Sequence, residues 1–72
     1  MTSKAKSVLD EQFLEMRWRL LSLAADFDRI QRAGDGALPD DPRIAALRHA
    51  AALLQDDAPG RAERLQMLLS DG

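Results

Sequence analysis

The 72-residue chain contains no cysteine and no tyrosine, and only 4% of its residues are aromatic. Without cysteine it forms neither disulfides nor thiolate zinc sites, and cysteine nucleophiles are excluded. The shortage of aromatic rings leaves few platforms for base stacking. At this length a hydrophobic core rarely supplies more than roughly 3–5 kcal/mol, and small domains without disulfides or metals usually gain stability by self-association. Size and composition therefore favour an oligomer.

An excess of positive charge and long apolar runs are also missing. The formal net charge is −2, which argues against a nucleic-acid-binding protein, because such proteins normally carry a basic stripe. No apolar run approaches the roughly 20 residues that cross a membrane. Asp10 and Glu11 interrupt the apolar segment that a secretory signal would need. We therefore expect a cytoplasmic protein without membrane contact, and the richness in Ala, Arg, Asp and Leu is typical of GC-rich bacterial genomes.

The local signals predict an all-α fold. β-branched residues are few and no strand-like alternation occurs. We expect a flexible tail over residues 1–6, followed by a single helical domain over 7–72. Its helices are predicted at about 8–33, 42–56 and 59–70.

Capping residues set these predicted boundaries. Ser7 can cap the first helix, and Gly34 suits its end, where a left-handed residue is wanted. Asp41 is predicted to cap the second helix, with Pro42 at its first position, where no N–H is needed. Asp57 lies where the third helix is expected to begin, and capping explains its placement better than catalysis does.

The first helix carries an unbroken alternation of apolar residues spaced by four and three positions, which we call the main seam. Its members are Leu9, Phe13, Met16, Leu20, Leu23, Phe27 and Ile30. This spacing predicts a helix that packs against other helices. The two shorter helices together roughly match the first in length. The sequence thus allows either a broken helical hairpin, which we favour, or a three-helix bundle.

A second apolar set with the same spacing points almost the opposite way on the first helix. This second row consists of Leu14, Trp18, Leu21 and Ala25. One seam is enough to build a small core, and contiguous exposed apolar patches often mark partner sites. We interpret the second row as the candidate interface of a homodimer. The alternatives are burial inside a three-helix bundle and a site for a different protein.

No catalytic, metal or cofactor motif is found. His49, the only histidine, has no metal-ligating residue three or four positions away. The pairs Glu15–Arg19 and Asp28–Arg32 have the spacing of intrahelical ion pairs. The remaining basic residues outside the first helix could form a modest patch for an acidic partner; they are Arg43, Arg48, Arg61 and Arg64.

These observations predict a small, non-enzymatic helical protein–protein interaction module without cofactors, which self-associates and could also bind another protein. The process it serves is not encoded in any motif. The alternative is a nucleic-acid-associated regulator that uses the second and third helices, whose size resembles a helix-turn-helix. The acidic balance of the chain opposes this alternative.

Overall fold

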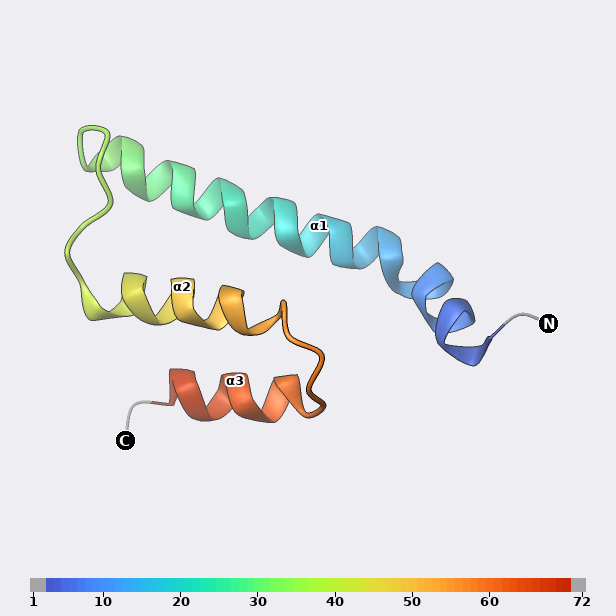
Figure 1. Cartoon of the computed structure of the whole chain (residues 1–72). Helices are drawn as coiled ribbons and strands as arrows, with labels where there is room; N and C mark the ends of the chain where they lie inside the picture. The colour runs from blue at the N-terminus through green and yellow to red at the C-terminus, as the bar shows by residue number, and fades with distance from the viewer. Residues whose placement is uncertain (1–2, 71–72) are drawn as a thin grey trace. The chain divides into compact units, whose positions relative to one another are not determined.

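The computed structural model describes residues 3–70 and contains three helices in that range, with no strand among them. They are α1 (Lys4–Ala33), α2 (Pro42–Leu53) and α3 (Arg61–Leu69) (Figure 1). The predicted all-α class is therefore confirmed. The helices belong to two compact units, an N-terminal unit (Met1–Leu38) that contains α1 and a C-terminal unit (Pro39–Gly72) that contains α2 and α3.

Helix α1 begins four residues before the predicted position. The hydroxyl of Ser3 accepts a hydrogen bond from the Lys6 backbone N–H at 3.0 Å and caps the helix. Lys6 also forms an ion pair with Asp10 across one turn, at 3.2 Å. The predicted tail is therefore wrong for Lys4 to Lys6, and Ser7 lies inside the helix and does not cap it. The first two residues of that predicted tail, 1 and 2, lie outside the described residues.

The end of α1 shows why glycine is needed at position 34. Gly34 follows the helix with φ −96°, so the left-handed conformation predicted for it is wrong. The left-handed residues are Asp35 (φ 56°) and Gly36 (φ 93°). The constraint on Gly34 is close packing, because a Cβ there would lie 2.3 Å from the Ala37 carbonyl oxygen.

Replacing Gly34 with alanine is therefore expected to open this turn. The methyl group must displace backbone, at a cost of roughly 1–3 kcal/mol for the strain. Amide hydrogen exchange should show faster exchange at Gly36 and Ala37, which donate to Gln31 and Gly34. Gly36→Ala is the matched control, because a Cβ there meets no atom within 4 Å and tests the positive φ alone. Unchanged amide exchange at Gly36 and Ala37 in the Gly34 variant would contradict the packing argument.

Helix α2 begins as predicted. Asp41 is its N-cap and accepts a hydrogen bond from the Arg43 backbone N–H at 2.8 Å, and Pro42 occupies the first turn. The helix ends at Leu53, before the predicted residue 56, because the next backbone N–H groups bond three residues back, as in Leu54 to Ala51 at 3.2 Å. Such i to i−3 bonds tighten and terminate a helix.

Helix α3 begins at Arg61, later than the predicted residue 59, and ends at Leu69. Its N-cap is Gly60, with φ 72° and no side-chain hydrogen bond. The predicted cap by Asp57 is therefore wrong.

Helices α2 and α3 pack side by side and run in opposite directions (Figure 1). The broken hairpin, which we favoured, would require α3 to continue in the direction of α2. The direction that it gives for α3 is therefore wrong. The buried hydrophobic residues of the described chain are Ile44 and Ala50, both on α2. Leu54, the residue that follows α2, is 48% exposed. The packing of α1 against other helices stays a prediction.

Candidate interaction surface

Helix α1 has 30 residues and none of them is buried. Along the main seam, Phe27 is half-buried, and the other members are between 37% and 62% exposed. A surface helix in water gains most of its stability by packing an apolar face, and propensity alone gives marginal helices. The main seam is thus an apolar surface that α1 does not bury within its own helix.

The second row is equally accessible. Trp18 is 59% exposed, Leu14 and Leu21 are similarly open, and Ala25 is exposed. The Arg17 guanidinium lies over the indole, with its Cζ 5.6 Å from the ring centroid, in a cation–π contact. The four candidate interface residues lie together on one helix, and none of them is buried. Their role as an interface stays a prediction.

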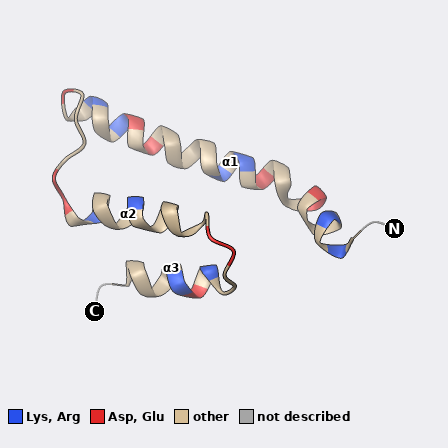
Figure 2. Ribbon diagram, in the orientation of Figure 1, with Lys and Arg blue, Asp and Glu red and all other residues tan. Residues whose placement is uncertain are grey.

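Charged residues of both signs are interspersed along α1 (Figure 2). The predicted ion pair between Glu15 and Arg19 is confirmed, at 3.0 Å. The predicted pair between Asp28 and Arg32 is absent from the ion pairs of residues 3–70, and Arg29 pairs with Asp26 one turn earlier. The four side chains of the two ion pairs that are formed are each more than half exposed.

Most of the basic residues predicted as a patch on the C-terminal unit are paired with carboxylates. Arg43 contacts Asp41 through Nε and through Nη2, at 3.0 and 2.9 Å. Arg64 forms a two-pronged contact with the Asp56 carboxylate, at 2.9 and 3.1 Å. Arg61 donates to the backbone oxygen of Asp56. These pairs reduce the positive charge offered to an acidic partner or to nucleic acid. They give no support to the alternative of a nucleic-acid-associated regulator that uses α2 and α3.

The contact with Arg43 has a consequence for Asp41. Hydrogen bonds from the Arg43 side chain and then from its backbone N–H lower the pKa of the Asp41 carboxyl to about 2, from an ordinary value of 3.8. Because the folded-state pKa is depressed, the cap stabilises α2 fully above the ordinary value, and its contribution is lost as the pH falls towards about 2.

We therefore expect acid to weaken α2 between pH 3.8 and about 2, the window set by the two pKa values of Asp41. NMR titration of the Asp41 carboxyl, followed together with the amide signals of α2, measures this. Asp41→Asn is the control, because asparagine also caps helices but carries no charge to titrate. A midpoint at the ordinary value in the wild-type protein would contradict the expected effect of Arg43.

Asp56 joins the α2–α3 loop to α3. Its carboxylate accepts from the Ala58 backbone N–H at 3.0 Å as well as from Arg64. The Arg64 hydrogen bond is the main cause that lowers the pKa of the Asp56 carboxyl. Sequence reasoning missed this contact, since it joins residues eight positions apart across a turn and no helical spacing signals it.

Asp56→Asn should lower the thermal midpoint of the C-terminal unit by several degrees. Asparagine retains the acceptor for Ala58 but removes the charge that holds Arg64. Asp57→Asn is the matched control, because Asp57 enters no hydrogen bond or ion pair among the described residues. Differential scanning fluorimetry with an external dye, at low salt, measures the difference. Equal midpoints for the two variants would contradict a stabilising role for the pair.

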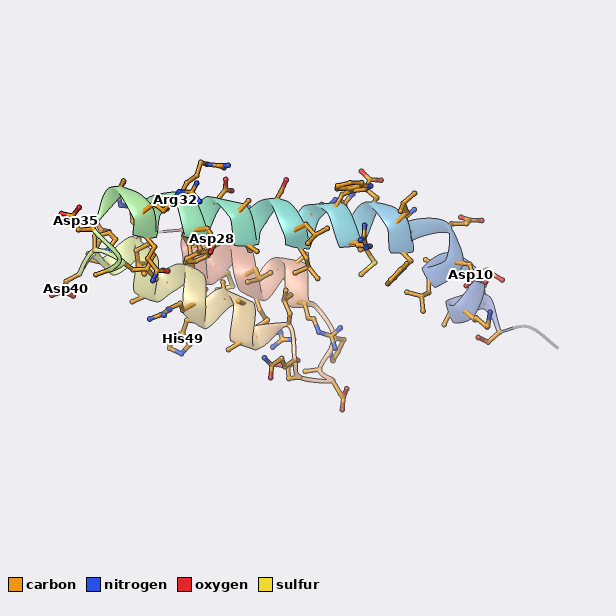
Figure 3. All side chains as sticks on the ribbon, turned by 90° about the horizontal axis from the view of Figure 1, so that it is seen from above. Asp10, Asp28, Arg32, Asp35, Asp40 and His49 are labelled. Carbon is orange, nitrogen blue, oxygen red and sulfur yellow. The ribbon has the colours of Figure 1, made fainter. Side chains whose placement is uncertain are left out.

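His49 is exposed and projects from α2 (Figure 3). Between residues 3 and 70, no group of three or more His, Cys, Asp or Glu side chains is arranged to hold a metal ion. In the same range, no helix combines the length and the apolar character that a membrane crossing requires.

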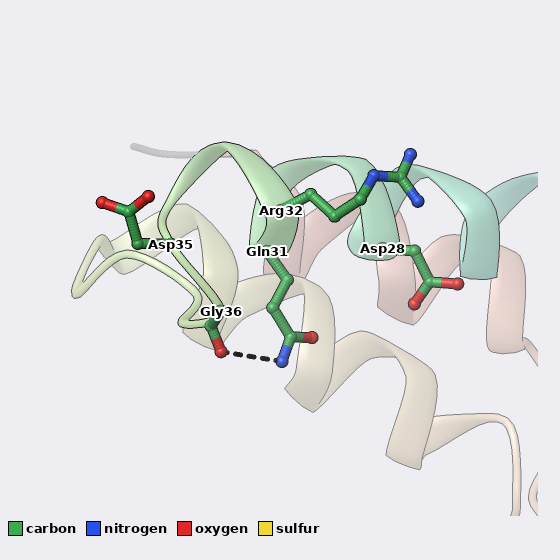
Figure 4. Close-up of a pocket in the computed structure, with 5 residues that line it drawn as sticks. All are labelled: Asp28, Gln31, Arg32, Asp35 and Gly36. Carbon is green, nitrogen blue, oxygen red and sulfur yellow. Dashed lines mark hydrogen bonds between the residues drawn. The ribbon is translucent and has the colours of Figure 1, made fainter.

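A shallow recess lies at the end of α1. It is lined by Asp28, Gln31, Arg32, Asp35 and Gly36. The Gln31 amide donates a hydrogen bond to the Gly36 carbonyl oxygen at 3.0 Å (Figure 4), so the polar groups at this point hold the turn that follows the helix.

No family model matches this chain, and no significant match was found among curated proteins or among solved structures.

Proposed function

We propose that this protein is a small, non-enzymatic helical interaction module that self-associates, as a dimer, through α1. The observation that carries the proposal is that α1 has no buried residue, although apolar side chains are exposed along its whole length. Exposed apolar surface of this extent marks interaction sites in soluble proteins. A bacterial, cytoplasmic protein is part of the same proposal.

A second copy is the partner that the composition supports best. The chain is short and has no cysteine, and the buried hydrophobic core of its described part consists of Ile44 and Ala50. Self-association supplies the apolar burial that such a chain lacks. Two faces of α1 are available for the contact, namely the second row, predicted from the sequence, and the main seam.

The mass of the protein in solution tests the proposal. Light scattering after gel filtration should give a mass above one chain, and dilution should lower both the mass and the helical signal in circular dichroism. The helical signal should fall because α1 without a partner is a marginal helix. A mass of one chain with undiminished helicity over the whole concentration range would refute self-association.

A further inference from the structure

The main seam has the spacing of a heptad repeat, so its flanking residues can be assigned to coiled-coil positions. With Phe13, Leu20 and Phe27 at position a, the remaining seam residues fall at d. The flanking e positions hold Asp10, Arg17, Ala24 and Gln31, and the flanking g positions hold Gln12, Arg19, Asp26 and Ala33. Residues at e and g set the orientation and the register of paired helices.

In one antiparallel register, every layer from residue 13 to residue 30 is apolar. In this register Phe13 faces Ile30 of a second copy, Met16 faces Phe27, and Leu20 faces Leu23. At the g positions, Arg19 faces Asp26 of the second copy, and the two-fold symmetry repeats this pair. No like charges face each other at e or g.

The rival registers lack this match. If the register shifts by one heptad towards the N-terminus, Arg17 faces Arg17 of the second copy and Arg19 faces Arg19. A shift of one heptad in the opposite direction sets Asp26 against Asp26 of the second copy. An in-register parallel pair sets Arg19 against Ala24 and forms no opposite-charge pair. Like charges across an interface are costly and help to exclude wrong arrangements.

We propose that α1 pairs with α1 of a second copy as an antiparallel coiled coil on the main seam, with Arg19 and Asp26 fixing the register. This inference rests on the proposed self-association and names its surface. The second row then lies on the outer side of each α1.

The two charged residues are accessible for this role. The side chain of Arg19 is 65% exposed and that of Asp26 is 54% exposed. Each already has a partner on its own helix, Glu15 and Arg29 respectively. A guanidinium group has five N–H donors and a carboxylate accepts several hydrogen bonds, so the contacts within a helix and between helices are compatible.

A charge exchange in the full-length protein tests the register. Arg19→Asp and Asp26→Arg should each raise the dissociation constant of the dimer about tenfold or more at low salt, because two attractive pairs become repulsive. The double variant should regain a dissociation constant close to that of the wild-type protein, because the carboxylate introduced at position 19 would again face a guanidinium, now at position 26. A mixture of the two single variants should form heterodimers in preference to homodimers, measured by native mass spectrometry.

The double variant separates this proposal from effects within one helix. It keeps both intrahelical repulsions, since the new carboxylate lies one turn from Glu15 and the new guanidinium one turn from Arg29. If the single substitutions acted only through contacts within one helix, the double variant would therefore form the weakest dimer of the three variants. Glu15→Gln with Arg29→Gln is the control, which removes the intrahelical pairs and should leave the dissociation constant unchanged.

A dimer whose double variant is no stronger than the single variants would overturn the antiparallel register and leave the proposed self-association standing. A wild-type protein that stays as single chains would overturn both.

Discussion

Leu20→Asp is expected to leave the protein as single chains at concentrations where the wild-type protein is assembled. In a single chain Leu20 is 62% exposed, so the substitution costs that state little. In the proposed pair it lies in a central layer beside Leu23 of the second copy. Two unpaired carboxylates would be buried there by symmetry, at a cost of several kcal/mol each. Light scattering measures the mass, and circular dichroism should show a loss of α1 helicity.

Trp18→Asp is the matched control, because Trp18 has a similar exposure of 59% but lies on the second row. The antiparallel seam predicts that this variant keeps the mass of the wild-type protein. The opposite result, a mass lowered by Trp18→Asp and unchanged by Leu20→Asp, would assign the contact between copies to the second row, as the sequence predicts.

Ile44→Asp should unfold the C-terminal unit. Ile44 is 9% exposed, so an aspartate there is buried without a partner, and burial of an unpaired charge is among the few mechanisms that cost more than about 4–5 kcal/mol. NMR spectra should lose the dispersed amide signals of α2 and α3. Ala45→Asp, at an exposed position on the same helix, is the control and should retain them. Retained dispersion in the Ile44 variant would show that this side chain contributes little to the core.

The helices could be predicted wherever a local signal was strong. Asp41 and Pro42 fix the start of α2 because capping and the missing proline N–H both act within one turn. The start of α1 was predicted one turn too late, with Ser7 as its cap. In the structure the hydroxyl of Ser3 caps the helix by accepting from the Lys6 backbone N–H, and the Lys6 side chain pairs with Asp10.

The features missed depend on contacts through space. Gly34 was expected at the end of α1 for its conformational freedom, but the Ala37 carbonyl oxygen imposes the actual constraint. The pairing of Asp56 with Arg64 appears only once the turn brings them together. Similarly, periodicity alone defined the two apolar rows of α1, whereas their accessibility could be learned only from the folded chain.

The link between Asp56 and Arg64 spans eight residues, so the C-terminal unit closes a short loop when it folds. Loops of about 10 residues close in roughly 10–100 ns, whereas the assembly of subunits takes milliseconds or longer and requires two molecules to collide. For a dimer formed through α1, the slow phase of refolding should therefore accelerate in proportion to the chain concentration.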